Sequence, residues 1–142
     1  MGDRRGHLAR ALAGLTDLVA VSPLYETEPV GGPPGQEDYL NLVVEMDTGL
    51  GPRDLLALAQ RLEEEAGRVR TVRHGPRTLD VDVLLVGHLV VDEPDLVVPH
   101  PRMWERRFVV EPLGDLAPDL VTPSERIASG GAVRRLGRLE GY

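Results

Sequence analysis

The alternation of apolar and acidic side chains in residues 79–85 sets the strongest limit on what this chain can fold into. Asp80 and Asp82 lie between apolar residues at every second position, which are Leu79, Val81, Val83 and Leu85. Because successive side chains of a strand point to opposite faces, the pattern predicts a strand with both carboxylates on one face. Their Cα atoms would lie about 6 to 7 Å apart. Both side chains could then reach one metal ion or a pair of ions.

Two neighbouring carboxylates favour a magnesium site, because Mg²⁺ is usually held by one or two carboxylates together with substrate phosphates. A strand with one solvated face is the alternative, and the alternation alone does not separate the two. The preceding loop favours magnesium and phosphate, since Arg68, Arg70, Arg73 and Arg77 lie there and residues 68–74 include no acidic residue. The planar fork of arginine is a good phosphate clamp. A solvated run of charges is the alternative for this loop.

The composition excludes several classes of protein. A chain of 142 residues with 42% hydrophobic residues predicts a single globular domain over residues 1–142. The absence of cysteine excludes disulfides and thiol chemistry, and the absence of lysine excludes a GxxxxGK[ST] phosphate loop. A net charge of −7 argues against nucleic-acid partners. No apolar run approaches the length of a membrane span. We therefore expect a cytoplasmic protein without a membrane partner.

Periodicity and turn residues predict the order helix, strand, strand, helix, strand, short strand, helices. The expected helices cover residues 4–15, 52–67 and 103–107, the last continued through Leu116 despite Pro112. Expected strands cover residues 19–27, 39–48 and 79–86, with a Gly- and Pro-rich loop over residues 28–36. A turn at Gly87-His88 should join the third strand to a short strand at 89–91. A final helix should dock through Ile127, Val133 and Leu136.

Five sequence blocks stand in a characteristic order along the chain. The most specific block is GPRTLDVDVLLVG at Gly75–Gly87. The others are YETEPVG at Tyr25–Gly31, DYLN at Asp38–Asn41, Gln60 and Glu63 followed by GRVR at Gly67–Arg70, and VPHPRMWERRF at Val98–Phe108. With these blocks the chain resembles the 6-hydroxymethyl-7,8-dihydropterin pyrophosphokinase family over nearly its whole length. The resemblance implies an α+β, ferredoxin-like sandwich of an antiparallel sheet with helices on its face. It also implies transfer of pyrophosphate from ATP to the pterin in folate biosynthesis.

The resemblance assigns roles to individual residues of this sequence. Asp80 and Asp82 would hold two Mg²⁺ ions on the triphosphate. The catalytic arginines would be Arg68, Arg70 and Arg77, in a loop that orders over ATP. The remaining ATP-binding residues would be Gln60, Glu63, His100 and Arg106. The pterin would be surrounded by Thr27, Pro29, Val30, Tyr39, Asn41 and Phe108. The implied substrates are ATP and hydroxymethyldihydropterin, and we expect a monomer.

The N-terminus departs from the family pattern, because members begin with a strand that ends in a Gly-Ser-Asn-Leu-Gly-like turn and only Met1-Gly2-Asp3 matches it. We therefore expect the domain to lack the first strand, and a form extended by about 5 to 10 residues to be more stable and more active. Two alternatives stay open. One is a ferredoxin-like regulatory or metal-binding module without activity. The other is a Mg²⁺-dependent phosphotransferase with another acceptor, against which Tyr39 and Asn41 argue.

Overall fold

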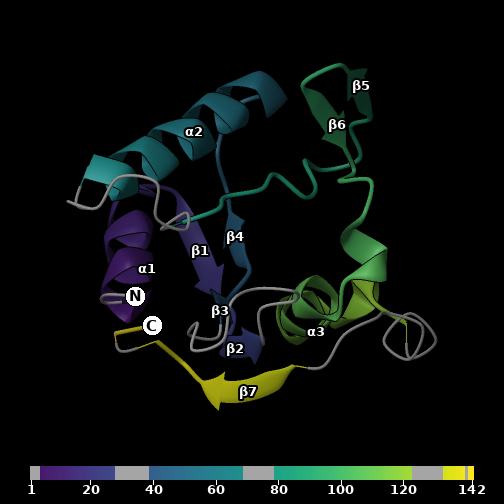
Figure 1. Ribbon diagram of the computed structural model, residues 1–142. Helices are drawn as coiled ribbons and strands as arrows, with labels where there is room; N and C mark the ends of the chain where they lie inside the picture. Colours follow the sequence, from purple (N-terminus) through teal and green to yellow (C-terminus); the bar gives the residue numbers. More distant parts are fainter. Residues whose placement is uncertain (1–3, 28–38, 69–78, 123–132, 140) are drawn as a thin grey trace, which may run out of the picture. The chain divides into compact units, whose positions relative to one another are not determined.

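The computed structural model describes residues 4–27, 39–68, 79–122, 133–139 and 141–142, and for Arg68 it describes the main chain alone. Within these ranges the protein is an α+β structure in which every strand pair is antiparallel (Figure 1). The described α-helices are α1 (Arg4–Ala13), α2 (Pro52–Arg68) and α3 (Arg107–Leu116). The expected α+β class is therefore confirmed.

The chain divides into two compact units. The first consists of Met1–Arg5, Asp17–Asp47 and Arg102–Tyr142, and the second of Gly6–Thr16 and Thr48–Pro101. The expected loop over residues 28–36 lies outside the described residues. The arginine-rich segment over residues 69–77 lies outside them as well.

Each of the first two expected strands is broken in two, which corrects the sequence prediction. Residues 19–27 form β1 (Leu18–Val21) and β2 (Leu24–Thr27), and residues 39–48 form β3 (Tyr39–Asn41) and β4 (Val44–Met46). β1 pairs with β4, and β2 pairs with β3. The first strand breaks at Ser22-Pro23, where proline has no N–H for the ladder. The second breaks opposite this point, at Leu42-Val43. There the Val43 N–H donates to the Ser22 hydroxyl at 2.9 Å.

The C-terminal segment is a strand, so the expected final helix is wrong. β7 (Arg134–Gly137) pairs antiparallel with β2, giving a three-stranded sheet of order β3-β2-β7 (Figure 1). β2 has a second edge whose backbone groups can pair with another strand. The spacing of apolar residues in the C-terminal segment does not reveal this pairing. Ile127 lies outside the described residues.

The buried core of the first unit forms where α3 packs against β2 and the short 3-10 helix η1 (Met103–Glu105). Leu24, Met103 and Val110 are fully buried there. The helix runs from Arg107 to Leu116 with Pro112 inside it, so the expected continuation past Pro112 is confirmed. A second 3-10 helix, η2 (Pro118–Leu120), follows α3.

The helices α1 and α2 match their predictions closely. α1 ends one residue before Gly14, and α2 begins at Pro52, whose fixed φ suits the first helical position. Ala59, Leu62 and Ala66 form the buried stripe of α2. The helix includes Gly67 and ends at Arg68, one residue beyond the expected stop. None of the described helices is long and apolar enough to cross a membrane.

Residues 79–86 form no strand, which corrects the prediction on which the alternation argument rested. Figure 1 draws them as a coil. A strand needs a neighbouring strand to bond with, and here main-chain groups bond elsewhere. The Val81 N–H donates to the Glu63 side chain, and the Leu84 C=O accepts from the His100 N–H at 2.9 Å. The hairpin of this region is instead β5 (Val91–Glu93) with β6 (Leu96–Val98). The expected pairing of 79–86 with 89–91 is wrong.

Candidate functional site

No strand forms at the two aspartates, but their exposure still alternates with that of their apolar neighbours. Asp80 and Asp82 are both exposed, while Leu79, Val81 and Val83 are half-buried. The apolar side chains are therefore partly covered, whereas the carboxylates are open to solvent. Both carboxylates are accessible to a cation or to a ligand from solution.

The expected ATP-binding residues of α2 lie one turn apart on that helix. Gln60 is exposed, whereas Glu63 is half-buried. An Oε atom of Glu63 accepts a hydrogen bond from the Val81 N–H at 2.8 Å. Val81 is the residue between the two aspartates. The structure therefore joins Glu63 directly to the acidic segment, through its main chain.

A cavity of about 290 Å³ lies beside this segment and contains Asp82 and His100 in its wall. The apolar part of the lining comes mainly from Leu56, Val81, Val83, Leu96 and Val97. His100 is held next to the segment by its main-chain bond to Leu84. The cavity combines apolar side chains with the polar groups of Asp82, Asp95 and His100, and such a combination suits a small molecule. The structure thus brings together two residues that the sequence analysis assigned to one substrate.

An ion-pair cluster that the sequence analysis did not identify ties α2 to the β5–β6 hairpin. Arg53 lies at 2.7 Å from the Asp95 carboxylate and also pairs with Glu93. Asp95 is part of the cavity wall. The hydrogen bond from Arg53 and its charge lower the pKa of the Asp95 carboxyl. No sequence signal marks this contact, because the partners lie about forty positions apart and each is common on protein surfaces.

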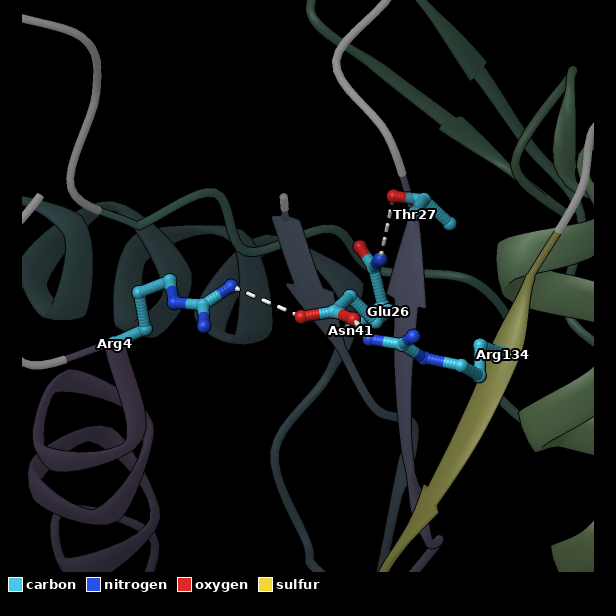
Figure 2. A network of polar contacts seen from close by, with 5 residues as sticks. All are labelled: Arg4, Glu26, Thr27, Asn41 and Arg134. Atoms are coloured by element: carbon cyan, nitrogen blue, oxygen red, sulfur yellow. Dashed lines mark hydrogen bonds and ion pairs between the residues drawn. The ribbon is translucent and has the colours of Figure 1, made fainter. Parts of the chain in front are cut away.

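Three of the expected pterin-binding residues, Thr27, Tyr39 and Asn41, lie on the paired strands β2 and β3. Thr27 is opposite Tyr39, and Tyr25 is opposite Asn41. The Asn41 amide donates to the Thr27 hydroxyl at 3.1 Å (Figure 2). The Tyr39 side chain is 52% exposed. Since Thr27 takes one donor of the amide, the Asn41 carbonyl oxygen and second N–H can serve a ligand.

Glu26 supports this end of the sheet and was also missed by the sequence analysis. Its carboxylate pairs with Arg4 at 3.4 Å and with Arg134 of β7 (Figure 2). The Glu26 side chain is only 10% exposed, so two cations compensate a largely buried charge. The three residues lie far apart in the sequence, and no local pattern predicts the cluster.

Two residues assigned to different substrates contact each other in the first unit. The guanidinium of Arg106, expected on the ATP side, lies 5.5 Å from the centre of the Phe108 ring, expected to stack on the pterin. This distance is typical of a cation–π contact. Arg106 can therefore orient the Phe108 ring.

Several expected site residues cannot be placed. Pro29, Val30, Arg70 and Arg77 lie outside the described residues, and the main chain of Arg68 ends α2. Among the described residues, no group of three or more His, Asp or Glu side chains could hold a metal ion. The pair of accessible carboxylates still fits Mg²⁺, because this ion typically keeps several waters and takes further oxygen ligands from substrate phosphates.

Comparison with known proteins identifies similar chains. The family model described as 7,8-dihydro-6-hydroxymethylpterin-pyrophosphokinase matches residues 1–118. Similar proteins named 2-amino-4-hydroxy-6-hydroxymethyldihydropteridine pyrophosphokinase come from Pseudomonas aeruginosa, with 54% identity over 78% of this chain and 68% of that protein, and from Bacillus subtilis, with 46% identity over 82% and 72%. The protein of that name from Haemophilus influenzae is 46% identical over 79% of this chain and 69% of its own.

Proposed function

Because the chain belongs to the 7,8-dihydro-6-hydroxymethylpterin-pyrophosphokinase family, we infer that it transfers pyrophosphate from ATP to 6-hydroxymethyl-7,8-dihydropterin in folate biosynthesis. The products are the pterin diphosphate and AMP, and the protein is an ATP-dependent diphosphotransferase. The match over residues 1–118 carries this conclusion, since it includes both the acidic segment and the β2–β3 pair. We further propose that the fold is a ferredoxin-like sandwich.

The reaction forms one bond and breaks another. The pterin hydroxymethyl oxygen bonds to the β-phosphorus of ATP and loses its proton, while the α,β-bridging oxygen leaves with AMP. Such a step needs alignment and charge neutralisation far more than a covalent intermediate. We expect the chain to supply binding groups accordingly.

For ATP, we propose that the nucleotide occupies the cavity beside Asp82 and His100. The apolar side chains of the lining suit a flat base, and the exposed Asp80 and Asp82 suit two magnesium ions on the triphosphate. Magnesium, when bound, neutralises negative charge on the phosphates. The loop arginines Arg68, Arg70 and Arg77 are proposed to contact the phosphates as well.

For the pterin, we propose that the ring is recognised in the first unit. Asn41 offers a carbonyl oxygen and an N–H whose orientation the Thr27 hydroxyl fixes, and this suits the amide-like edge of a pterin. Tyr39, Pro29 and Val30 would line the ring, and Phe108 would stack on it. Since these groups suit a heterocyclic ring rather than a phosphate, they favour a pterin over another acceptor.

Finer properties of the protein are also proposals. We propose that it acts as a monomer in the cytoplasm and without nucleic acid or membrane partners. The net charge of −7 supports the absence of nucleic-acid binding.

The test is to incubate the protein with Mg-ATP and hydroxymethyldihydropterin and to separate the nucleotides by chromatography. We expect AMP to form, and to form only when the pterin is present. Production of ADP in place of AMP would contradict the proposed function. A sample without the pterin measures background hydrolysis of ATP.

A further inference from the structure

The main chain between the two aspartates is held by a side chain from α2. The Val81 N–H donates to a carboxylate oxygen of Glu63 at 2.8 Å, and the contact is partly buried. A hydrogen bond from an amide to a carboxylate is stronger than one between neutral groups. Glu63 lies near the end of a 17-residue helix whose neighbouring residues Leu62 and Ala66 are buried. The acceptor is therefore fixed to a rigid element.

This bond matters because residues 79–86 are not part of a sheet. In a strand, an adjacent strand would bond to the amides and would fix where each side chain points. Here the Glu63 carboxylate does this for Val81. If the acceptor were removed, a partly buried N–H would lose its partner and the segment would lose a fixed point. Asp80 and Asp82 are covalently attached to Val81, so their directions depend on it.

We propose that Glu63 is a positioning residue: it holds the main chain of Val81 so that Asp80 and Asp82 point toward the same magnesium-bound triphosphate. This inference rests on the proposed function, and it differs from direct contact between Glu63 and ATP. Groups that orient metal ligands without touching the metal are known to change metal affinity or activity by about 10- to 100-fold when they are removed.

The positioning role makes a specific demand on the side chain. The group at position 63 needs an oxygen acceptor at the reach of glutamate, but it does not need negative charge. Glutamine keeps both the reach and the acceptor, because its amide has a carbonyl oxygen. Aspartate keeps the charge but is one methylene shorter. A residue that acts through its charge on a cation would show the opposite preference.

The experiment compares Glu63→Gln, Glu63→Asp and Glu63→Ala with the wild-type protein and with Glu64→Ala as a control. Glu64 is the next residue of α2 and is exposed, so its removal leaves the segment untouched. The first readout is calorimetric binding of Mg²⁺ with a non-hydrolysable ATP analogue. The second is hydrogen exchange of the Val81 amide, followed by NMR. Turnover with the pterin is measured separately.

We expect Glu63→Ala and Glu63→Asp to weaken analogue binding by about tenfold or more and to speed exchange at Val81. Glu63→Gln should stay within about threefold of the wild-type protein, since it keeps the acceptor. Glu64→Ala should behave as the wild-type protein does. If Glu63→Ala does not fold, the comparison of Gln with Asp decides, because both conserve most of the side chain.

Two results would overturn the proposal. One is unchanged analogue binding in Glu63→Asp and Glu63→Ala, and the other is a Glu63→Gln variant that is as impaired as Glu63→Asp. Failure of the proposed function looks different, because it is absence of AMP formation by the wild-type protein. Hydrogen exchange of the Val81 amide is measured without the pterin. It therefore tests the bond between Val81 and Glu63 whether or not the proposed function holds.

Discussion

At the scale of single residues, Thr27 fixes which groups of Asn41 face a ligand. Its hydroxyl accepts a hydrogen bond from the Asn41 amide at 3.1 Å. Thr27→Val removes the acceptor with little change in volume, so we expect the KM for the pterin to rise by about tenfold. The KM for ATP should change little. Steady-state kinetics with each substrate varied in turn measures both values.

Thr27→Ser is the matched control, because serine keeps the hydroxyl and loses only a methyl group. It should bind the pterin as the wild-type protein does. If Thr27→Val and Thr27→Ser have the same KM for the pterin, the hydroxyl does not orient Asn41.

Asp82 gives a second prediction at this scale. Its carboxylate is exposed and lies in the wall of the proposed nucleotide cavity. We expect Asp82→Ala to abolish turnover and to leave the fold unchanged, because an exposed charge contributes little to stability. AMP formation and circular dichroism measure the two effects. Retention of about a tenth of the wild-type rate would argue against an essential metal ligand.

The sequence draws attention to certain residues of the candidate site, and their roles stay predictions. Asp80 and Asp82 are conspicuous because acidic residues interrupt an apolar run, and both prove to be accessible. The contact of Glu63 with Val81 could not be predicted, since it joins residues eighteen positions apart through a main-chain atom. Glu26 with its two arginines escaped prediction for the same reason.

At the scale of elements, the sequence predicts α1 and α2 well, but it predicts a final helix where the strand β7 lies, and it predicts the other strands poorly. The apolar spacing of α2 and the proline at its start are local signals, and they place the helix to within a residue or two. Pairing of β7 with β2 depends on residues more than a hundred positions apart. Likewise, the alternation in residues 79–86 favours a strand, but a strand forms only where a neighbouring strand bonds to it.

Arg53 links two elements and leads to a prediction on pH. Its hydrogen bond and charge lower the pKa of the Asp95 carboxyl. A carboxyl with a lowered folded-state pKa stabilises the fold above its ordinary pKa of about 3.9. This contribution is lost as the pH falls through the folded-state pKa. We expect Arg53→Gln to move the pKa of Asp95 upward, toward its ordinary value, as measured by NMR titration of the carboxyl carbon.

Salt provides the control for this prediction. Because the pair is exposed, about 1 M NaCl should raise the pKa of Asp95 in the wild-type protein and have a smaller effect in Arg53→Gln. An Asp95 pKa that is the same in both proteins at low salt would show that Arg53 does not bind it in solution.

At the scale of the whole molecule, the two compact units contain different groups of expected site residues. The first unit contains Thr27, Tyr39, Asn41 and Phe108, which are proposed to bind the pterin. The acidic segment and His100 belong to the second unit, with the proposed nucleotide cavity. Arg106 is the exception, because it was assigned to ATP and contacts Phe108 in the first unit. The sequence does not reveal this division, since the segments of the two units alternate along the chain.

The core of the first unit supports a prediction on stability. Leu24 is completely buried in β2 beneath α3. Leu24→Ala should lower the free energy of unfolding by about 2 to 5 kcal/mol, because it removes buried methyl groups and leaves a cavity. Leu120→Ala is the control, since that side chain is 49% exposed. Urea denaturation measures both, and equal losses in the two variants would contradict the described core.

The transfer of two phosphoryl groups in one step is the central claim, and mass spectrometry of the pterin product tests it most directly. The protein is incubated with Mg-ATP and hydroxymethyldihydropterin, and the masses of the pterin and the nucleotides are measured in the same sample. We predict a pterin that has gained two phosphoryl groups, with one AMP formed for each. A pterin that has gained a single phosphoryl group, with ADP as the nucleotide product, would contradict the account.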